Sequence, residues 1–243
     1  MLKQNTGKNP KVFSDIAMRF HIYKLLLILG GVMSAFCMAG CREKDSFPQP
    51  ASRQPGHAIT IVALGDSLTE GYGVEEHLAY PALLEAMLQK EGFSGTVINA
   101  GISGETSSGL LSRIRRVLSL KPDIVILCTG ANDGLQGMDH GLIQNNISKM
   151  VRIFKEHRIT VVLAGMKMLV NYGPSYTAPY DRLYAEIADQ EEILFIPFLL
   201  EGIAGKPELT LADGIHPNAK GYKIIAASLY PLVLKAVHQR QAQ

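Results

Sequence analysis

Four short, glycine-rich segments of the sequence carry side chains or backbone groups that could act on a carbonyl substrate. Ser67 lies in residues 65–73 (GDSLTEGYG), and Asn132 lies in residues 129–134 (TGANDG). Asp213 and His216 lie in residues 212–217 (ADGIHP), and Gly104 lies in residues 99–107 (NAGISGETS). Glycine lets the backbone and a substrate approach each other closely. These segments therefore indicate a site built from loops.

The residue types in these segments fit acyl transfer. A serine hydroxyl is a weak nucleophile until a base takes its proton. His216 can be that base for Ser67, and Asp213 can orient the other ring nitrogen and stabilise the imidazolium. Attack on a carbonyl builds an oxyanion, which needs preorganised donors. The candidate donors are the backbone N–H groups of Ser67 and Gly104 and the side-chain amide of Asn132.

Alternating strands and helices must position these segments. Short apolar runs predict strands over residues 59–64, 96–99, 124–129, 160–164 and 193–196. Apolar residues at helical spacing predict helices over residues 79–90, 108–120, 142–157, 176–189 and 219–237. This alternation predicts one α/β domain, a parallel sheet covered by helices on both faces in three layers. Ligands bind at the carboxyl ends of such strands, beside the switch point, where the polar segments fall.

Taken together and in order, the four segments resemble the conserved blocks of the SGNH, or GDSL, hydrolase family, and the similarity runs from residue 59 to the C-terminus. The family's serine, glycine, asparagine and histidine, and then its triad acid, fall on Ser67, Gly104, Asn132, His216 and Asp213. The resemblance implies a flavodoxin-like SGNH hydrolase fold with a five-stranded parallel sheet. It also implies a serine esterase that needs no metal or organic cofactor.

The likeness is greatest to the bacterial periplasmic branch of thioesterase I, arylesterase and lysophospholipase. That branch has runs similar to residues 102–107 (ISGETS), 130–135 (GANDGL), 171–173 (NYG) and 213–217 (DGIHP). The substrates that this resemblance implies are small esters or lipids: aryl esters, acyl thioesters or lysophospholipids. Ala131 stands where the family also commonly has glycine, which leaves the chemistry of Asn132 unchanged.

Two apolar segments are candidates for walls of the substrate site. Residues 166–174 should lie over the site, and Tyr72 should form a second wall. We therefore expect Tyr72, Asn171 and Tyr172 to contact the substrate. The apolar character suits an acyl chain but does not fix its length.

Three other functions remain open. A carbohydrate O-acetyl esterase belongs to the same superfamily. A metal-dependent phosphoesterase would use carboxylate and imidazole ligands at strand ends, here Asp66, Asp133, Asp213 and His216. One histidine is sparse for such a site, and Ser67 and Asn132 would have no role in it. The third is a binding lipoprotein that keeps the fold without catalysis.

Composition and charge narrow the function classes further. The chain has 243 residues, 47% of them hydrophobic, and a net charge of +2. The high hydrophobic content and small net charge exclude an intrinsically disordered chain. So small a positive charge gives no argument for nucleic acid as a partner. Residues 1–40 hold five basic residues and one acidic residue, so the remainder, with 19 basic and 21 acidic residues, has a net charge of −2. The basic excess therefore belongs to the leader.

The leader is typical of an export signal. Residues 25–39 form an apolar run after Lys24, too short for a confident transmembrane helix. The run ends Met38-Ala39-Gly40-Cys41, which resembles the lipobox of bacterial lipoproteins, although Met38 replaces the usual leucine. We therefore predict a signal peptide over residues 1–40, whose true start could be Met18, and a lipidated Cys41.

The domain organisation follows from this leader. Residues 41–57, which contain Pro48, Pro50 and Pro55, predict a flexible tether, and residues 58–243 predict the hydrolase domain. We expect a monomer attached through Cys41 to the periplasmic side of the inner or outer membrane. A soluble periplasmic or secreted protein is the alternative.

Overall fold

The computed structural model describes residues 58–168 and 170–242 of the chain. The predicted signal peptide, Cys41 and the predicted tether lie outside these residues. Within them, strands and helices alternate as the sequence predicts. The strands are β1 (Ile59–Gly65), β2 (Gly95–Gly101), β3 (Ile124–Cys128), β4 (Thr160–Ala164) and β5 (Leu194–Ile196). The longer helices are α3 (Tyr80–Lys90), α7 (His140–Glu156), α8 (Pro174–Glu191) and α9 (Ala219–Gln241). The shorter helices are α2 (Ser67–Glu70), α4 (Ser107–Ser112), α5 (Ile114–Ser119) and α6 (Ala131–Leu135). Two 3-10 turns, η1 (Glu76–Leu78) and η2 (Val170–Tyr172), complete the set within the described residues.

The five strands form one parallel sheet in the order β2-β1-β3-β4-β5. Gly65 at the end of β1 pairs with Gly101 of β2 on one side and with Cys128 of β3 on the other. The chain winds outward from β1 to β2 and then crosses to β3, so the switch point lies between β1 and β3. The predicted five-stranded parallel sheet of flavodoxin-like order is confirmed.

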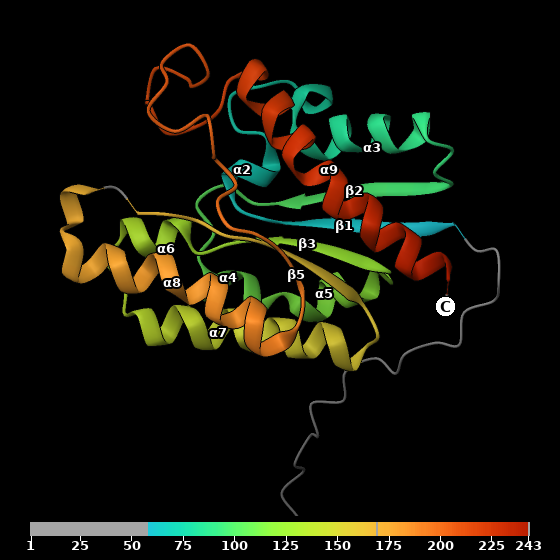
Figure 1. Ribbon diagram of the computed structural model, residues 1–243, viewed down its shortest axis with the longest axis horizontal. Helices are drawn as coiled ribbons and strands as arrows, with labels where there is room; N and C mark the ends of the chain where they lie inside the picture. Colours follow the sequence, from blue (N-terminus) through green and yellow to red (C-terminus); the bar gives the residue numbers. More distant parts are fainter. Residues whose placement is uncertain (1–57, 169, 243) are drawn as a thin grey trace, which may run out of the picture. The chain divides into compact units, whose positions relative to one another are not determined.

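Helices cover both faces of the sheet, in three layers (Figure 1). Helices α3 and α9 lie on one face, and α4, α5, α7 and α8 lie on the other. The central strand β3 (IVILC) is buried at every residue, and β1 (ITIVALG) at all but Thr60. Parallel strands covered on both faces read as such continuous apolar runs, which is why the sequence pattern located them.

The prediction of one continuous helix over residues 108–120 is wrong. The structure divides it into α4 and α5, with Arg113 between them. Arg113 has φ −102° and ψ 11°, and its backbone N–H donates to the carbonyl of Leu110 at 3.2 Å, a tighter turn than an α-helix makes. The apolar periodicity continues across this break, so periodicity alone could not reveal it.

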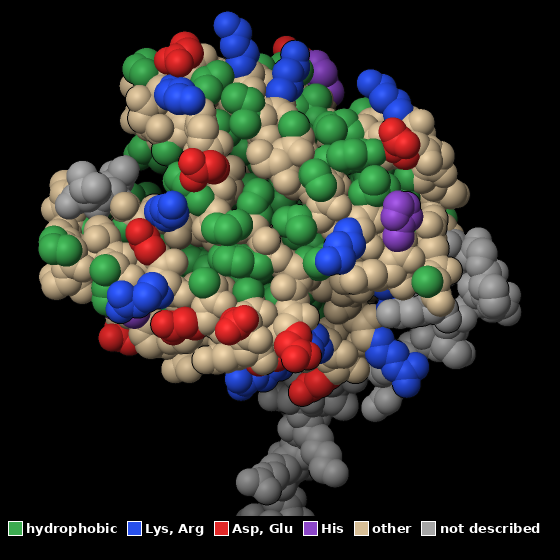
Figure 2. All heavy atoms as spheres, viewed as in Figure 1, with side chains coloured by type: hydrophobic (Ala, Val, Ile, Leu, Met, Phe, Trp, Pro, Cys, Tyr) green, Lys and Arg blue, Asp and Glu red, His purple; other side chains and the backbone are tan. Residues whose placement is uncertain are grey.

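The outer strand β5 has three residues, and their side chains are half-buried. In Figure 2, hydrophobic side chains gather in the middle of the visible face, where β5 runs between α8 and α9 in Figure 1. So short an edge strand offers few unpaired backbone groups to another sheet. No helix in the described part of the chain is long and apolar enough to span a bilayer.

Candidate active site

Ser67 lies immediately beyond the carboxyl end of β1. The chain passes from Gly65 through Asp66 into α2, whose first residue is Ser67. Asp66 caps this helix, because its Oδ1 accepts the N–H of Leu68 at 3.0 Å. A Cβ on Gly65 would lie 2.3 Å from the carbonyl oxygen of Cys128, so only glycine fits there. The local sequence thus forces a tight turn that presents Ser67 beside the switch point.

His216 and Asp213 complete a chain of hydrogen bonds that ends at Ser67. The Oγ of Ser67 and the Nε2 of His216 are 2.8 Å apart, and the Nδ1 of His216 lies 2.7 Å from the Oδ2 of Asp213. The other carboxylate oxygen of Asp213 accepts the backbone N–H groups of Ile215 at 2.9 Å and His216 at 3.0 Å. The structure therefore brings together three residues that are up to 149 positions apart.

Asp213 is held in its charged form. Partial burial raises its pKa, but the hydrogen bonds from the His216 ring and from the N–H groups of Ile215 and His216 outweigh burial and lower the pKa to about 2. Asp213 is therefore ionised at neutral pH. An ionised carboxylate in this position can fix the tautomer of His216 and stabilise its protonated form.

Asp66 has the opposite electrostatic character. Its side chain is 1% exposed, and burial raises its pKa to about 6, although the Leu68 N–H and the nearby His216 act in the other direction. Its Oδ2 has no hydrogen-bond partner among the described residues. A partly unsatisfied carboxylate thus lies directly next to Ser67.

Gly104 lies in the loop that follows β2, and this loop is attached to the β1 end. The N–H of Ile102 donates to the carbonyl of Gly65 at 3.0 Å, and the carboxylate of Glu70 on α2 accepts both the N–H of Ser103, at 3.0 Å, and its hydroxyl. Gly104 itself has φ +78°, a conformation that favours glycine. Its backbone is thus set by contacts with the element that carries Ser67.

Asn132 lies on α6, directly after β3. Its Nδ2 donates to the backbone carbonyl of Glu105 at 3.0 Å. An asparagine amide carries two N–H groups, so one remains to bind a ligand. The neighbouring Asp133 is fully buried and accepts the N–H and the hydroxyl of Ser107 at 2.8 Å and 2.5 Å. Two sets of hydrogen bonds therefore join the loops that carry Gly104 and Asn132.

Tyrosines on α8 also hold the β3 loop, a feature that sequence reasoning missed. The hydroxyl of Tyr180 donates to the carbonyl of Gly130 at 2.8 Å, and that of Tyr184 donates to Thr129 at 2.9 Å. Tyrosines recur at every fourth position, 172, 176, 180 and 184; the last three lie on one face of α8, and Tyr172 belongs to η2. The spacing was visible in the sequence, but the carbonyl groups to which these tyrosines donate were not.

The three predicted substrate contacts lie in different surroundings. The Tyr72 ring is half-exposed and lies 4.6 Å from the His216 ring, so it borders the triad. The hydroxyl of Tyr172 donates to the carbonyl of Leu135 at 2.8 Å, at the end of α6, and Asn171 is exposed. Ile102 and Ile215, on the two loops that carry Gly104 and His216, are exposed apolar side chains that sequence analysis did not single out.

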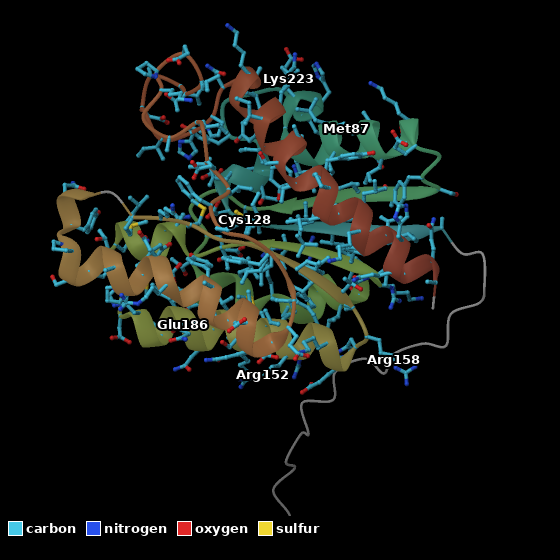
Figure 3. The ribbon with its side chains drawn as sticks, viewed as in Figure 1. Met87, Cys128, Arg152, Arg158, Glu186 and Lys223 are labelled. Carbon is cyan, nitrogen blue, oxygen red and sulfur yellow. The ribbon has the colours of Figure 1, made fainter. Side chains whose placement is uncertain are left out.

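The residues considered for a metal-dependent phosphoesterase do not form a ligand set. Asp133 is bonded to Ser107, and Asp213 is bonded to His216. Within residues 58–168 and 170–242, no group of three or more His, Cys, Asp and Glu side chains is arranged to hold a metal ion. Cys128, the one cysteine of the described region, is buried at the end of β3 in the middle of the domain (Figure 3).

A serine, histidine and aspartate joined by hydrogen bonds at the carboxyl edge of a parallel α/β sheet define a serine hydrolase. Comparison with known proteins agrees. The model of the GDSL-like lipase/acylhydrolase family matches residues 63–224. The esterase TesA of Pseudomonas aeruginosa is 34% identical over 200 residues, which cover 82% of this chain and 97% of that protein.

Two further similarities are to a second named enzyme and to a solved structure. The thioesterase 1/protease 1/lysophospholipase L1 of Escherichia coli strain K12 is 33% identical over 181 residues, 72% of this chain and 86% of that one. The crystal structure of the psychrotrophic esterase EstA from Pseudoalteromonas sp., inhibited by monoethylphosphonate, matches with a TM-score of 0.70 at 32% identity and covers 74% of this chain and 98% of that one. The chain belongs to the GDSL-like lipase/acylhydrolase family, as its motifs indicated, and is a serine esterase of the SGNH type.

Proposed function

We propose that the chain hydrolyses carboxylic esters and thioesters through an acyl-enzyme on Ser67. The observation that carries the proposal is the continuous hydrogen-bond chain from Asp213 through His216 to the Ser67 hydroxyl. Such a chain lets a neutral imidazole take the serine proton while the carboxylate stabilises the charge that the ring acquires.

The reaction then has two halves. The Oγ of Ser67 bonds to the carbonyl carbon as its proton passes to Nε2 of His216. The tetrahedral intermediate collapses, the alcohol or thiol leaves with that proton, and the acyl group stays on Ser67. Water attacks the acyl-enzyme with His216 again as base, which releases the carboxylic acid and restores the serine.

In this proposal the oxyanion binds three N–H groups: the backbone N–H groups of Ser67 and Gly104 and the second amide N–H of Asn132. Support comes from the hydrogen bond between the loops that follow β2 and β3, in which one amide N–H of Asn132 donates to the carbonyl of Glu105. Preorganised donors of this kind need no rearrangement when the charge develops.

For the substrate we propose apolar acyl groups, such as those of aryl esters, acyl thioesters and lysophospholipids. The exposed apolar side chains of Tyr72, Ile102 and Ile215 lie on the loops that carry the proposed catalytic groups, and Tyr72 contacts the His216 ring. The relatives named as an esterase and as a thioesterase and lysophospholipase support the same range. Contacts of Asn171 and Tyr172 with the substrate remain part of the proposal.

We further propose that the protein is an exported lipoprotein, acylated at Cys41 and joined by residues 41–57 to its catalytic domain. The support is the leader sequence, with its basic residues, short apolar run and lipobox-like ending. An anchored esterase would meet lysophospholipids at the membrane surface.

The experiment is hydrolysis of p-nitrophenyl butyrate by the wild type and by Ser67→Ala, with labelling by a fluorophosphonate probe. We expect the variant to lose both turnover and labelling while its thermal unfolding stays cooperative. Turnover that survives the substitution would refute the acyl-enzyme, and activity that EDTA abolishes would favour a metal-dependent route. A chain-length series of p-nitrophenyl esters, beside lysophosphatidylcholine and acetylated xylan, ranks the substrates; a preference for acetylated xylan would indicate a carbohydrate O-acetyl esterase.

A further inference from the structure

Arg113, at the junction of α4 and α5, forms an ion pair with Glu105. Its Nε donates to Oε1 of Glu105 at 2.7 Å, and its Nη2 donates to Oε2 at 2.5 Å, a two-pronged ion pair. The side chains are 17% and 10% exposed. The same Nη2 donates to the carbonyl of Ala100 in β2 at 2.8 Å. One guanidinium therefore holds both ends of the segment that contains Gly104.

Glu105 transmits this fixed position to the β3 loop. Its carboxylate is held by Arg113, while its backbone carbonyl accepts the Nδ2 of Asn132. The side chain of Glu105 lies against Gly109, where a Cβ would be 3.1 Å from its Cγ. The glycine leaves room for Glu105 to lie along α4 and reach Arg113. Any shift of Glu105 would thus move the group that orients the Asn132 amide.

Glu105 also closes the turn that presents Gly104. Its N–H donates to the carbonyl of Ile102 at 3.1 Å, across Ser103 and Gly104. Gly104, at φ +78°, has no neighbour close to where a Cβ would stand. The direction of its backbone N–H is therefore set by the residues on both sides of it: Ser103, which is bonded to Glu70, and Glu105, which is bonded to Arg113.

We propose that Arg113 is a positioning residue for the oxyanion hole, acting through Glu105 on the N–H of Gly104 and on the amide of Asn132. The inference rests on the oxyanion hole of the proposed function. The hydrogen bonds of Arg113 go to Glu105 and Ala100 and not to Ser67 or His216, so it acts on the donors and leaves the nucleophile and its base in place. A misplacement of about 1 Å in such a group can lower turnover about 100-fold.

The test uses Arg113→Met, which removes the ion pair, and Arg113→Lys, which keeps the charge but loses the two-pronged geometry. We expect kcat for p-nitrophenyl butyrate to fall about 10- to 100-fold in Arg113→Met and less in Arg113→Lys, with KM within about threefold of the wild type. The pH at which the acid limb of kcat/KM is half-maximal should not move, because the triad is intact. A general loosening of the site would shift KM and this midpoint as well.

An ion pair of a second, similarly buried glutamate elsewhere controls for stability. Glu191, 11% exposed, accepts the Nε of Arg152 at 2.7 Å, much as Glu105 accepts that of Arg113. Arg152 lies on α7, in the helix layer on the lower side of Figure 3. Glu105→Gln and Glu191→Gln, the latter through loss of its ion pairs with Arg152 and Lys155, should both lower the melting temperature, but only Glu105→Gln should lower kcat. Equal effects of both on kcat would reduce the role of Arg113 to stability and overturn the inference.

A double substitution separates this inference from the function beneath it. Asn132→Ala alone should lower kcat about 10²- to 10³-fold. With Asn132 absent, adding Arg113→Met should cost less than it does in the wild type, because one of its two targets is gone. Fully multiplicative effects, or an Arg113→Met kcat equal to that of the wild type, would overturn the positioning role while Asn132→Ala still upholds the oxyanion hole. An unchanged kcat in Asn132→Ala would instead overturn the proposed oxyanion hole, and the inference with it.

Discussion

The buried carboxyl of Asp66, next to the nucleophile Ser67, lowers the stability of the folded protein. Its carboxyl caps α2 through Leu68, yet its second oxygen has no hydrogen-bond partner among the described residues. Burial raises its pKa from 3.8 to about 6. Burying a charge without full compensation is unfavourable, so the ionised form makes the folded state less stable than a neutral side chain would.

Asp66→Asn should therefore stabilise the protein in a pH-dependent way. Between pH 3.8 and 6 the unfolded chain releases its Asp66 proton before the folded chain does, so wild-type stability falls as the pH rises through this window. Above pH 6 the loss is complete, at about 3 kcal/mol. Asparagine keeps the helix cap and never ionises. The free energy of unfolding of Asp66→Asn relative to wild type should hence be larger at pH 7.5 than at pH 4.

Urea unfolding at the two pH values measures this difference. Asp139→Asn is the control, since Asp139 also caps a helix, through the N–H of Leu142 at 3.0 Å, but is exposed to solvent that hydrates its carboxylate. That variant should show no comparable gain at the higher pH. A relative stability of Asp66→Asn that does not change between the two pH values would contradict the account of Asp66.

At the scale of elements, the sequence predicted what depends on local pattern and missed what depends on distant partners. The strands and long helices follow from apolar periodicity, and Ser67, Gly104 and His216 follow from motifs in loops. The division of residues 108–120 at Arg113 does not, because the apolar face continues through the break. The partner of Tyr184, the carbonyl of Thr129, lies 55 positions away, and no local pattern encodes that distance.

The tyrosines of α8 make this long-range contact testable. Tyr180 is fully buried, and its hydroxyl lies between the carbonyl of Gly130, at 2.8 Å, and the hydroxyl of Tyr184, at 2.9 Å. Tyr180→Phe would leave a buried carbonyl without its donor, which costs about 1–3 kcal/mol. Because Gly130 directly precedes the helix that carries Asn132, we expect a lower melting temperature together with a reduced kcat.

Tyr176→Phe is the matched control on the same face of α8. Its hydroxyl also donates to a carbonyl, that of Met138 at 2.9 Å, but both residues are partly exposed, so water can replace the lost bond. Its melting temperature and kcat should change less than those of Tyr180→Phe. Equal losses in the two variants would show that the contact of the Tyr180 hydroxyl with Gly130 has no special role.

For the whole molecule, charge and cysteines divide along the chain in the same way. The basic excess lies in residues 1–40, and the catalytic domain is near neutral. Cys37 lies in the predicted leader and Cys41 directly after it, while Cys128 is buried in the sheet. A thiol enclosed in β3 cannot reach an acyl donor, so Cys41 is the one candidate for the proposed lipid attachment in the chain that would remain after the predicted cleavage.

Lipidation at Cys41 can be tested by growing a Gram-negative host that expresses the full chain with an alkyne-tagged fatty acid. The wild type should carry the label, because acylation of Cys41 would attach the tagged chain. Each buried methylene of an attached chain contributes about 0.8 kcal/mol to membrane binding, so several chains would hold the protein on the membrane. Cys41→Ala should lose the label, and Cys128→Ala should keep it. The rate of p-nitrophenyl butyrate hydrolysis per folded molecule should be the same with and without the label, because Cys41 lies outside the domain that holds the triad. Label that persists in Cys41→Ala, or a wild type that carries none and has a free N-terminus elsewhere, would show an ordinary exported esterase instead.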